Sequence, residues 1–423
     1  MQSNSLTSET HVRCLLSAWF TRRNGTLNSY PCEDLKTVLS VKARPPAGRP
    51  SVTMLWPQMR KSGYCEGGIN TPPFSREAML RELPRFMTEV YSRRIQGFSN
   101  ATRFNMGGTG FFHQFYLWML VRALKPKHII ETGAYNGLGT WQLRQAAPDA
   151  QIIVVSPETP HLYVDEKPDS RYFTAEHFRD FALIDWDCMP GLDRSQTLVF
   201  VDDHQSGYRR LLEAHARGFR HTIYDDNEMP AKSDHFSAKG ACAAASGNLT
   251  GPIGWDDFRG IVADWGRWRR GSYFNVSAEQ LEQVGKSFSK VIDVYTEMPP
   301  LWTAGLPSRS YAPKPLLNDM AGTVFTANHR EHLRTFRQEA IAYGFFAYLR
   351  TKPLDSVPAG DLYYPPHVTT NGYSGILPMR PAGSCSRRNA KGASPTMLKR
   401  TRQSDDPRRN SGAGTHIRFG RKR

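Results

Sequence analysis

The feature that most constrains the fold of this chain is a short apolar run that leads into a cluster of glycines. The residues from Lys127 to Trp141 are KHIIETGAYNGLGTW. The apolar start predicts the end of a buried strand, and the residues after the last glycine predict the first turns of a helix. Glycines let the backbone approach a ligand, and a helix N-terminus offers free N–H groups. A strand, a glycine-rich turn and a helix together predict a nucleotide-type cofactor site.

The position of the carboxylate in this turn separates two classes of cofactor. Glu131 lies at the predicted strand end, two residues before Gly133, in the spacing E-x-G-x-x-x-G-x-G-T rather than G-x-G-x-x-G. A carboxylate there would repel a dinucleotide pyrophosphate, but it would suit a ligand with a cationic or hydroxyl group. The turn therefore favours S-adenosylmethionine over NAD. A plain glycine-rich βα turn without a ligand is the alternative.

The alternation of strands and helices predicts an α/β fold. Apolar runs predict a first strand that begins near His128 and further strands over 151–156, 171–174, 197–201 and 220–224. Helices are predicted over 111–124, 176–181 and 208–217. This order implies a Rossmann-like, doubly wound, mostly parallel sheet that binds ligands at the carboxyl ends of its strands. Beyond Pro230 the alternation is lost, and we predict helices over 277–297 and 328–349.

Composition divides the chain into four regions. Residues 1–75 are interrupted by Pro and Gly and are predicted to form an irregular N-terminal extension. Residues 76–300 form the Rossmann-like domain with flanking helices, and Ser75 is the expected cap of its first helix. Residues 301–375 form a C-terminal extension with a helix. Residues 376–423 are rich in Ser, Gly, Arg and Lys and form a disordered basic tail.

The basic excess of the chain belongs mostly to that tail. The net charge is +16 over 423 residues, and residues 380–423 contain thirteen Lys or Arg and two Asp, a net of +11. The charge therefore says little about the folded part. A disordered basic tail could associate with nucleic acid, and only through this tail is such a partner expected.

Cysteines, apolar runs and sequons leave the cellular location open. The six cysteines include no C-x-x-C pair, which argues against a zinc ribbon or a disulfide framework and favours single buried thiols. No run approaches the ~20 apolar residues of a membrane span, so we predict no transmembrane segment. Four N-x-[ST] sequons keep a secretory route open, with a cytoplasmic location as the default.

Acidic residues follow the fourth and fifth predicted strands. Asp202, Asp203 and His204 come after the fourth, and the fifth ends in a second group, Asp225, Asp226 and Asn227. In a parallel sheet these positions converge, and carboxylates that converge repel one another unless a cation joins them. Carboxylate and amide oxygens suit Mg²⁺. We predict that Asp202, Asp226 and Asn227 bind the metal. Asp203 and Asp225 are predicted to cap helices or to bond turn backbone.

These motifs resemble those of a known family. The stretch from about Phe111 to Pro230 resembles a class I S-adenosylmethionine-dependent methyltransferase domain. Residues 131–140 are similar to the first motif of that family, and residues 200–208 with 224–227 are similar to the metal-binding segments of catechol O-methyltransferase-like enzymes. The chain is also similar to the macrocin O-methyltransferase and cephalosporin hydroxylase-like groups and to uncharacterised algal proteins with this domain.

The resemblance implies roles for individual residues. The cofactor would be held by Glu131, Gly133, Ala134, Tyr135, Gly137, Gly139 and Thr140, together with Ser156 and Glu158. Asp202, Asp226 and Asn227 would bind Mg²⁺, and the metal would hold a substrate hydroxyl as its alkoxide. Two positions depart from the family pattern. Ser156 stands where the family carries an acid for the cofactor ribose, with Glu158 two residues on, and Gln205 replaces a lysine base.

His204 is the nearest substitute for that base, because a histidine has a suitable pKa for general base work. It could instead orient a carboxylate. The predicted function is an S-adenosylmethionine-dependent O-methyltransferase acting on a small-molecule or glycan hydroxyl. The alternatives are a non-methylating member of the fold, either hydroxylase-like or a binding module, and a nucleic-acid-associated protein. Neither the methyl acceptor nor the oligomeric state follows from the sequence.

Overall fold

The protein is described from a computed structural model. It describes residues 74–93, 108–227, 236–247, 261–264, 267–270, 277–301 and 345–364. The predictions for residues 1–73, for the helix part that covers 328–344 and for the basic tail lie outside these described residues.

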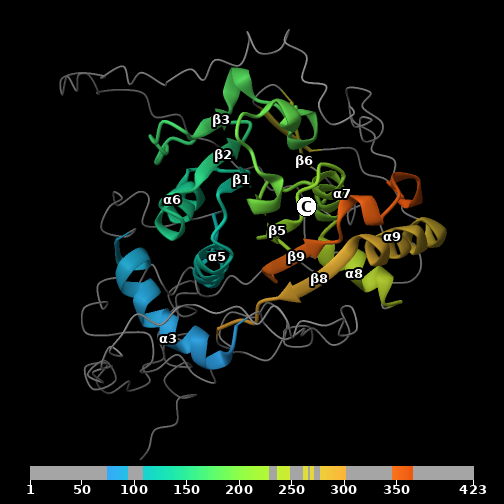
Figure 1. The fold of residues 1–423 in the computed structure, drawn as a ribbon, viewed down its shortest axis with the longest axis horizontal. Coiled ribbons are helices and arrows are strands. Elements are labelled where there is room, and N and C mark those ends of the chain that lie inside the picture. The colour runs from blue at the N-terminus through green and yellow to red at the C-terminus, as the bar shows by residue number, and fades with distance from the viewer. Residues whose placement is uncertain are drawn as a thin grey trace, which may run out of the picture. The chain divides into compact units, whose positions relative to one another are not determined.

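A seven-stranded sheet with the order β3-β2-β1-β4-β5-β9-β8 forms the centre of the protein (Figure 1). Its strands are β1 (His128–Thr132), β2 (Gln151–Val155), β3 (Arg171–Phe173), β4 (Thr197–Val201), β5 (His221–Tyr224), β8 (Ile292–Glu297) and β9 (Ala347–Thr351). The four pairs β3–β2, β2–β1, β1–β4 and β4–β5 are parallel. β9 is antiparallel to both of its neighbours, β5 and β8. This confirms the predicted mostly parallel α/β sheet. The strands β6 (Ile261–Asp264) and β7 (Arg267–Arg270) form a separate antiparallel pair.

Helices cover both faces of the sheet. The helices are α3 (Arg76–Phe86), a π-helical turn (Met87–Tyr91), α5 (Phe111–Leu124), α6 (Leu138–Ala146), α7 (Gly207–Ala216), α8 (Ala238–Ala245) and α9 (Ala278–Val291). Apolar residues of α3, α5 and α6 form one core cluster with the sheet, and those of α7, α8 and α9 form another on the opposite face. Short 3₁₀ turns lie at Ala175–His177, Phe181–Leu183, Trp186–Cys188, Arg194–Gln196, Leu354–Ser356 and Ala359–Asp361. The sheet is therefore doubly wound, which is the Rossmann-like arrangement.

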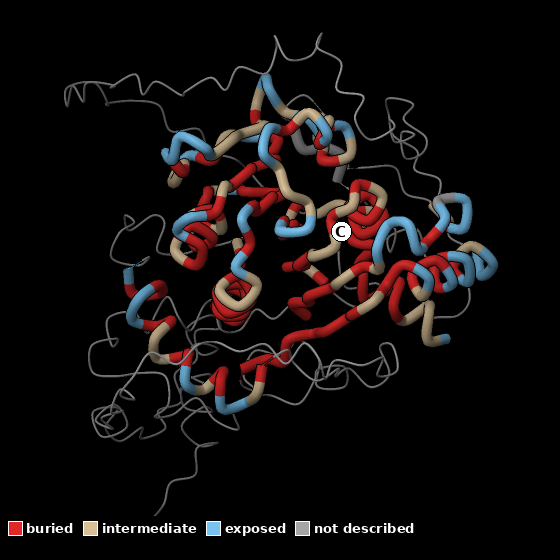
Figure 2. Tube along the Cα trace, viewed as in Figure 1, coloured by how far each residue is buried: buried red, intermediate tan, exposed pale blue. Residues whose placement is uncertain are grey.

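The central strands are buried because both of their faces carry helices. All five residues of β1 and all five of β4 are buried (Figure 2), as expected for a parallel sheet covered on both sides. The direction in which successive strands are added reverses between β1 and β4. The carboxyl ends of these two strands, at Thr132 and Val201, lie side by side in the register. Ligands of such sheets bind outside this reversal point.

Three predicted elements are wrong in part. The predicted helix over 277–297 begins as expected, with a capping box of Ser277 and Gln280, but it ends at Val291 and continues directly as β8. Residues 347–349 belong to β9 and not to a helix. The predicted helix over 176–181 is replaced by 3₁₀ turns. In the first two cases pairing within the sheet overrides local helical spacing.

Local signals were more reliable at helix starts. Ser75 caps α3 as predicted, because its hydroxyl accepts a hydrogen bond from the amide of Ala78 at 3.1 Å.

The expectation of free thiols is wrong for both cysteines among the described residues, since Cys188 and Cys242 are each disulfide-bonded. Among the helices in the described part of the chain, none combines the length and apolar character that crossing a bilayer requires.

Candidate functional site

The glycine turn between β1 and α6 is shaped by close backbone contacts. Gly133 has φ +82° and Gly137 has φ +88°, in the left-handed region that favours glycine. A Cβ at Gly133 would lie 2.1 Å from the carbonyl oxygen of Asp202, and one at Gly137 would lie 2.0 Å from that of Tyr163. These two glycines are therefore required by contacts within the protein itself, whether or not a ligand is bound.

Glu131, the residue before the last of β1, is buried and faces the start of α6. Its Oε2 accepts a hydrogen bond from the hydroxyl of Thr140 at 2.5 Å, and its Oε1 would lie 2.5 Å from a Cβ at Gly139. Burial raises the pKa of Glu131 to about 8, against the opposing effect of the Thr140 hydrogen bond. A positively charged ligand group nearby would favour the ionised form of this carboxyl.

The remaining residues predicted to hold a cofactor differ in exposure. Ala134 is buried, whereas Tyr135 at the tip of the turn is 56% exposed. At the end of β2, Ser156 is buried and its amide donates to the carbonyl of Phe173 at 3.2 Å. Glu158 is exposed. Of the two residues considered for a ribose contact, Glu158 is thus accessible to a ligand and Ser156 is not.

The segment after β2 folds back onto the glycine turn. The amides of Leu162 and Tyr163 both donate to the carbonyl of Asn136 at 3.2 Å. A buried pair holds the segment in place, because the Arg144 guanidinium donates to both carboxylate oxygens of Asp165, at 3.1 and 2.7 Å. Such two-point pairing fixes orientation as well as distance. No sequence pattern predicted this pair.

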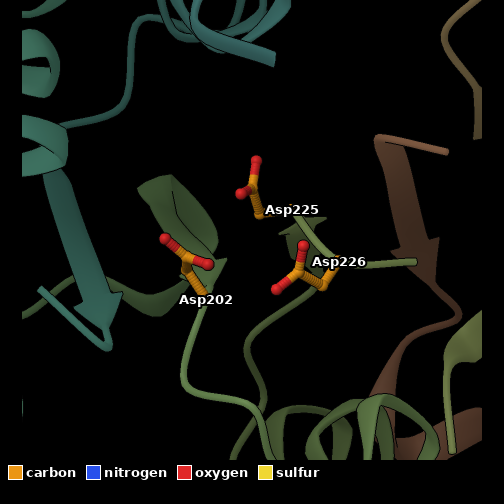
Figure 3. A group of neighbouring side chains, drawn as sticks. All are labelled: Asp202, Asp225 and Asp226. Carbon is orange, nitrogen blue, oxygen red and sulfur yellow. The ribbon is translucent and has the colours of Figure 1, made fainter. Parts of the chain in front are cut away.

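Three aspartates converge beyond β4 and β5. One ligand atom from each of Asp202, Asp225 and Asp226 can be chosen so that all lie within 4.8 Å of one another. The three side chains come from the ends of two neighbouring strands (Figure 3). The pKa of Asp202 is raised well above its usual range by burial first and then by the charges of Asp225 and Asp226. Burial and the neighbouring carboxylates thus both oppose ionisation of Asp202.

Asp203, next in the chain, has a different role. Its Oδ1 accepts from the amide of Gln205 at 3.2 Å, and its Oδ2 accepts from Nε of the buried Arg210 at 2.9 Å. Arg210 also binds Asp180 and Glu213. Asp203 is therefore the turn residue that the sequence predicted.

Asp225 and Asn227, which follow the fifth strand, have surroundings that differ from those predicted. Asp225, predicted to serve only the turn, belongs to the acidic cluster, and its Oδ1 lies 2.8 Å from Nδ1 of the buried His113. Asn227, predicted as a metal ligand, is buried, and its Oδ1 accepts from the amide of Lys239 at 2.8 Å. Its Nδ2 donates to the hydroxyl of Tyr295 at 2.9 Å. The amide of Asn227 thus serves other parts of the chain.

His204 lies at the edge of the cluster and remains partly exposed. Its φ is +53°, and its Nδ1 lies 3.6 Å from Oδ2 of Asp226. A histidine beside a carboxylate and open to solvent can take a proton from a bound hydroxyl. The structure therefore places the predicted base next to one of the predicted metal ligands.

The residues of the cluster suit a divalent cation. Three carboxylates offer hard oxygen donors, which Mg²⁺ prefers, and the raised pKa of Asp202 has a cause that a cation would remove. The residues that would hold it are Asp202, Asp225 and Asp226. The sequence missed Asp225, although it follows its strand at the same offset as Asp202.

Comparisons with known proteins add methyltransferases as structural neighbours. No family model matches the chain, and no curated protein matches it. An SAH-bound methyltransferase of Podospora anserina is 16% identical with a TM-score of 0.25, over 37% of this chain and 73% of that chain. The O-methyltransferase TomG from Streptomyces achromogenes, solved in complex with SAM, is 13% identical with a TM-score of 0.26, over 45% of this chain and 96% of that chain. The fold assignment rests on the strand order and register of this chain itself.

Proposed function

We propose that this protein is an S-adenosylmethionine-dependent methyltransferase that transfers the methyl group to a hydroxyl oxygen. The observation that carries the proposal is the meeting of two features at the reversal point of the sheet. The glycine turn after β1 touches the backbone of Asp202, so a ligand on the turn and a group at the acidic cluster would be neighbours. Methyl transfer needs such a pair of adjacent sites.

The charge of this edge supports the choice of cofactor. Glu131 is buried at the glycine turn and Asp202 lies among other carboxylates, so a cationic ligand group nearby would favour the ionised form of both. S-adenosylmethionine carries a sulfonium and an ammonium group, whereas a dinucleotide carries an anionic pyrophosphate. The protein can therefore stabilise the first ligand electrostatically and would repel the second.

In the proposed reaction S-adenosylmethionine, when bound, would supply an electrophilic methyl group. The hydroxyl oxygen of the acceptor would take this group as the S–CH₃ bond breaks and S-adenosylhomocysteine leaves. His204, beside Asp226, would accept the proton of that hydroxyl. Most of the acceleration would come from holding the two reactants in a reactive geometry.

Asp202, Asp225 and Asp226 would hold a divalent cation close to the acceptor. When bound, such a cation stabilises the negative charge that develops on the acceptor oxygen. His113 would keep Asp225 in place through its 2.8 Å contact. The role of the protein is to keep three carboxylates together that would otherwise repel one another.

The proposal is tested by calorimetric titration of the full-length protein with S-adenosylmethionine and with NAD, each with and without Mg²⁺. We expect binding of S-adenosylmethionine and none of NAD. A matched titration of Asp202→Asn separates the two halves, since it should keep cofactor binding and lose the effect of Mg²⁺. Absence of S-adenosylmethionine binding to the wild-type protein would refute the proposal.

A further inference from the structure

Four buried polar residues form a ring of hydrogen bonds beside the acidic cluster. They are Asn227, Lys239, Tyr295 and Glu297. β9 pairs with both β5 and β8, so that Ala347 lies opposite Tyr224 on one side and Glu297 on the other. Because β9 is antiparallel to both, β5 and β8 run in the same direction. Glu297 therefore ends its strand at the same edge of the sheet as the acidic cluster.

The ring is closed by hydrogen bonds through four residues. The amide of Lys239 donates to Oδ1 of Asn227 at 2.8 Å, and Nδ2 of Asn227 donates to the Tyr295 hydroxyl at 2.9 Å. That hydroxyl donates to Oε1 of Glu297 at 2.5 Å. The ammonium of Lys239 completes the ring on Glu297, with distances of 2.6 and 2.7 Å to its two oxygens.

Burial makes this ring stiff. All four residues are at most 6% exposed, and hydrogen bonds between charged groups away from water are stronger than those at the surface. The Lys239 ammonium also lies 4.3 Å from the centre of the Phe345 ring, a favourable cation–π contact. Paired in this way, the Lys239 side chain is held in one position.

The ring acts on the acidic cluster through Asn227. Asp225 and Asp226 lie between the end of β5 and Asn227, and the amide of Asn227 donates to the carbonyl of Asp225 at 3.1 Å. The turn is thus fixed at one end by the sheet and at the other by the ring. Without the second attachment, the repulsion among the three carboxylates would be free to drive them apart.

We propose that Tyr295, Glu297 and Lys239 are positioning residues that hold Asn227, and through it Asp225 and Asp226, in the arrangement that binds a divalent cation. The part of this inference that concerns the cation rests on the proposed function. The part that concerns the turn does not. Residues that orient metal ligands commonly change metal affinity by about 10- to 100-fold when they are altered.

The test compares two tyrosine hydroxyls on adjacent strands. Tyr295→Phe removes the link between Asn227 and Glu297 and leaves the Lys239–Glu297 pair intact. The matched control is Tyr348→Phe, because Tyr348 is also buried but bonds Nδ1 of His221 at 2.7 Å, at the opposite end of β5. The full-length proteins are compared by Mn²⁺ titration calorimetry, by hydrogen exchange of peptides covering residues 222–227, and by thermal unfolding.

We expect Tyr295→Phe to weaken Mn²⁺ binding about tenfold and to speed exchange at 222–227, whereas Tyr348→Phe should change neither. A folded Tyr295→Phe protein with unchanged exchange, or with faster exchange and unchanged Mn²⁺ affinity, overturns the proposal. If the wild-type protein binds no Mn²⁺ while the exchange still responds, the metal part of the proposed function fails and the attachment of the turn stands. Glu297→Gln, which perturbs the ring more strongly, is the second variant for the same three measurements.

Discussion

The two halves of the site are built in different ways. The glycine turn, Glu131 and the Arg144–Asp165 pair all belong to one continuous stretch from β1 to β3. In the acidic half, Asp225 is bonded to a residue 112 positions away, and Asn227 to one 68 positions away. The first half is a local βα unit, whereas the second is assembled from five elements spread along the chain.

This difference predicts different responses to mutation. In the glycine half the backbone fills the space, so an added atom has nowhere to go. In the acidic half the carboxylates repel one another. Replacing one of them should therefore stabilise the folded protein, and it should also weaken the binding of a cation. The following five substitutions, each with a measurement, test this contrast, from the largest expected effect to the smallest.

Gly133→Ala should have the largest effect, because its Cβ would overlap the carbonyl of Asp202 and its φ disfavours any side chain. We expect a loss of more than about 4 kcal/mol in the free energy of unfolding, measured by urea denaturation. Gly191→Ala is the control, since Gly191 has φ +73° but no atom within 4 Å of the added Cβ, and should cost about 1–2 kcal/mol. Equal losses in the two variants would contradict the contact.

Glu131→Gln should change how stability depends on pH. The folded protein holds the Glu131 proton up to about pH 8, whereas the unfolded chain releases it near 4.5. The folded state thus binds more protons in this window, and its free energy of unfolding falls as pH rises, by at most about 1.4 kcal/mol per pH unit. Urea denaturation at several pH values should show a shallower decline in Glu131→Gln. An unchanged decline would show that Glu131 is ionised in the folded protein.

Asp202→Asn and Asp203→Asn should move stability in opposite directions. The first removes a carboxyl group whose ionisation burial and its neighbours oppose, and it should raise the free energy of unfolding by about 1 kcal/mol. The second leaves the buried Arg210 short of a partner and should lower it by about 3 kcal/mol. Thermal unfolding with and without Mg²⁺ measures both, and only Asp202→Asn should lose stabilisation by the cation. Stabilisation of Asp202→Asn by Mg²⁺ would exclude that aspartate as a ligand.

Glu158→Gln should have the smallest effect, because Glu158 is exposed. Stability should change by less than about 0.5 kcal/mol. If its carboxylate binds the cofactor ribose, the affinity for S-adenosylmethionine should fall about tenfold, as for the loss of a hydrogen bond to a charged group. Glu176→Gln, at another exposed acid, should leave the affinity unchanged. An unchanged affinity in Glu158→Gln would show that the Glu158 carboxylate does not bind the cofactor ribose.

The same contrast explains how far the sequence could predict this molecule. Strand ends and the glycine turn follow from short local patterns. β4 begins and ends where those patterns place it, and β1 begins there but ends at Thr132, one residue later than predicted. The convergence of Asp202 and Asp226 follows from parallel pairing, which the strand alternation indicates. These predictions needed no knowledge of distant contacts.

The partners of Asp225 and Asn227 could not be predicted in this way. They are His113 from α5 and Tyr295 from β8, and the predicted long helix concealed β8. Once residues 292–297 are recognised as a strand, Glu297 becomes another acid at a strand end, by the rule that identified Asp202 and Asp226. The missing information was the pairing of β8 with β9, which no local pattern contains.

The place of β9 has a consequence for the synthesis of the protein. β9 lies between β5 and β8, although it follows β5 by more than a hundred residues and β8 by about fifty. During translation, the β5 edge that pairs with β9 therefore lacks this partner until residues 347–351 have left the ribosome. Because β8 joins β5 only through β9, we expect the ring around Asn227 to form no earlier than that. Shorter nascent chains can already contain the glycine turn. We expect the ability to bind a divalent cation to appear only late in translation, when the last strand is inserted.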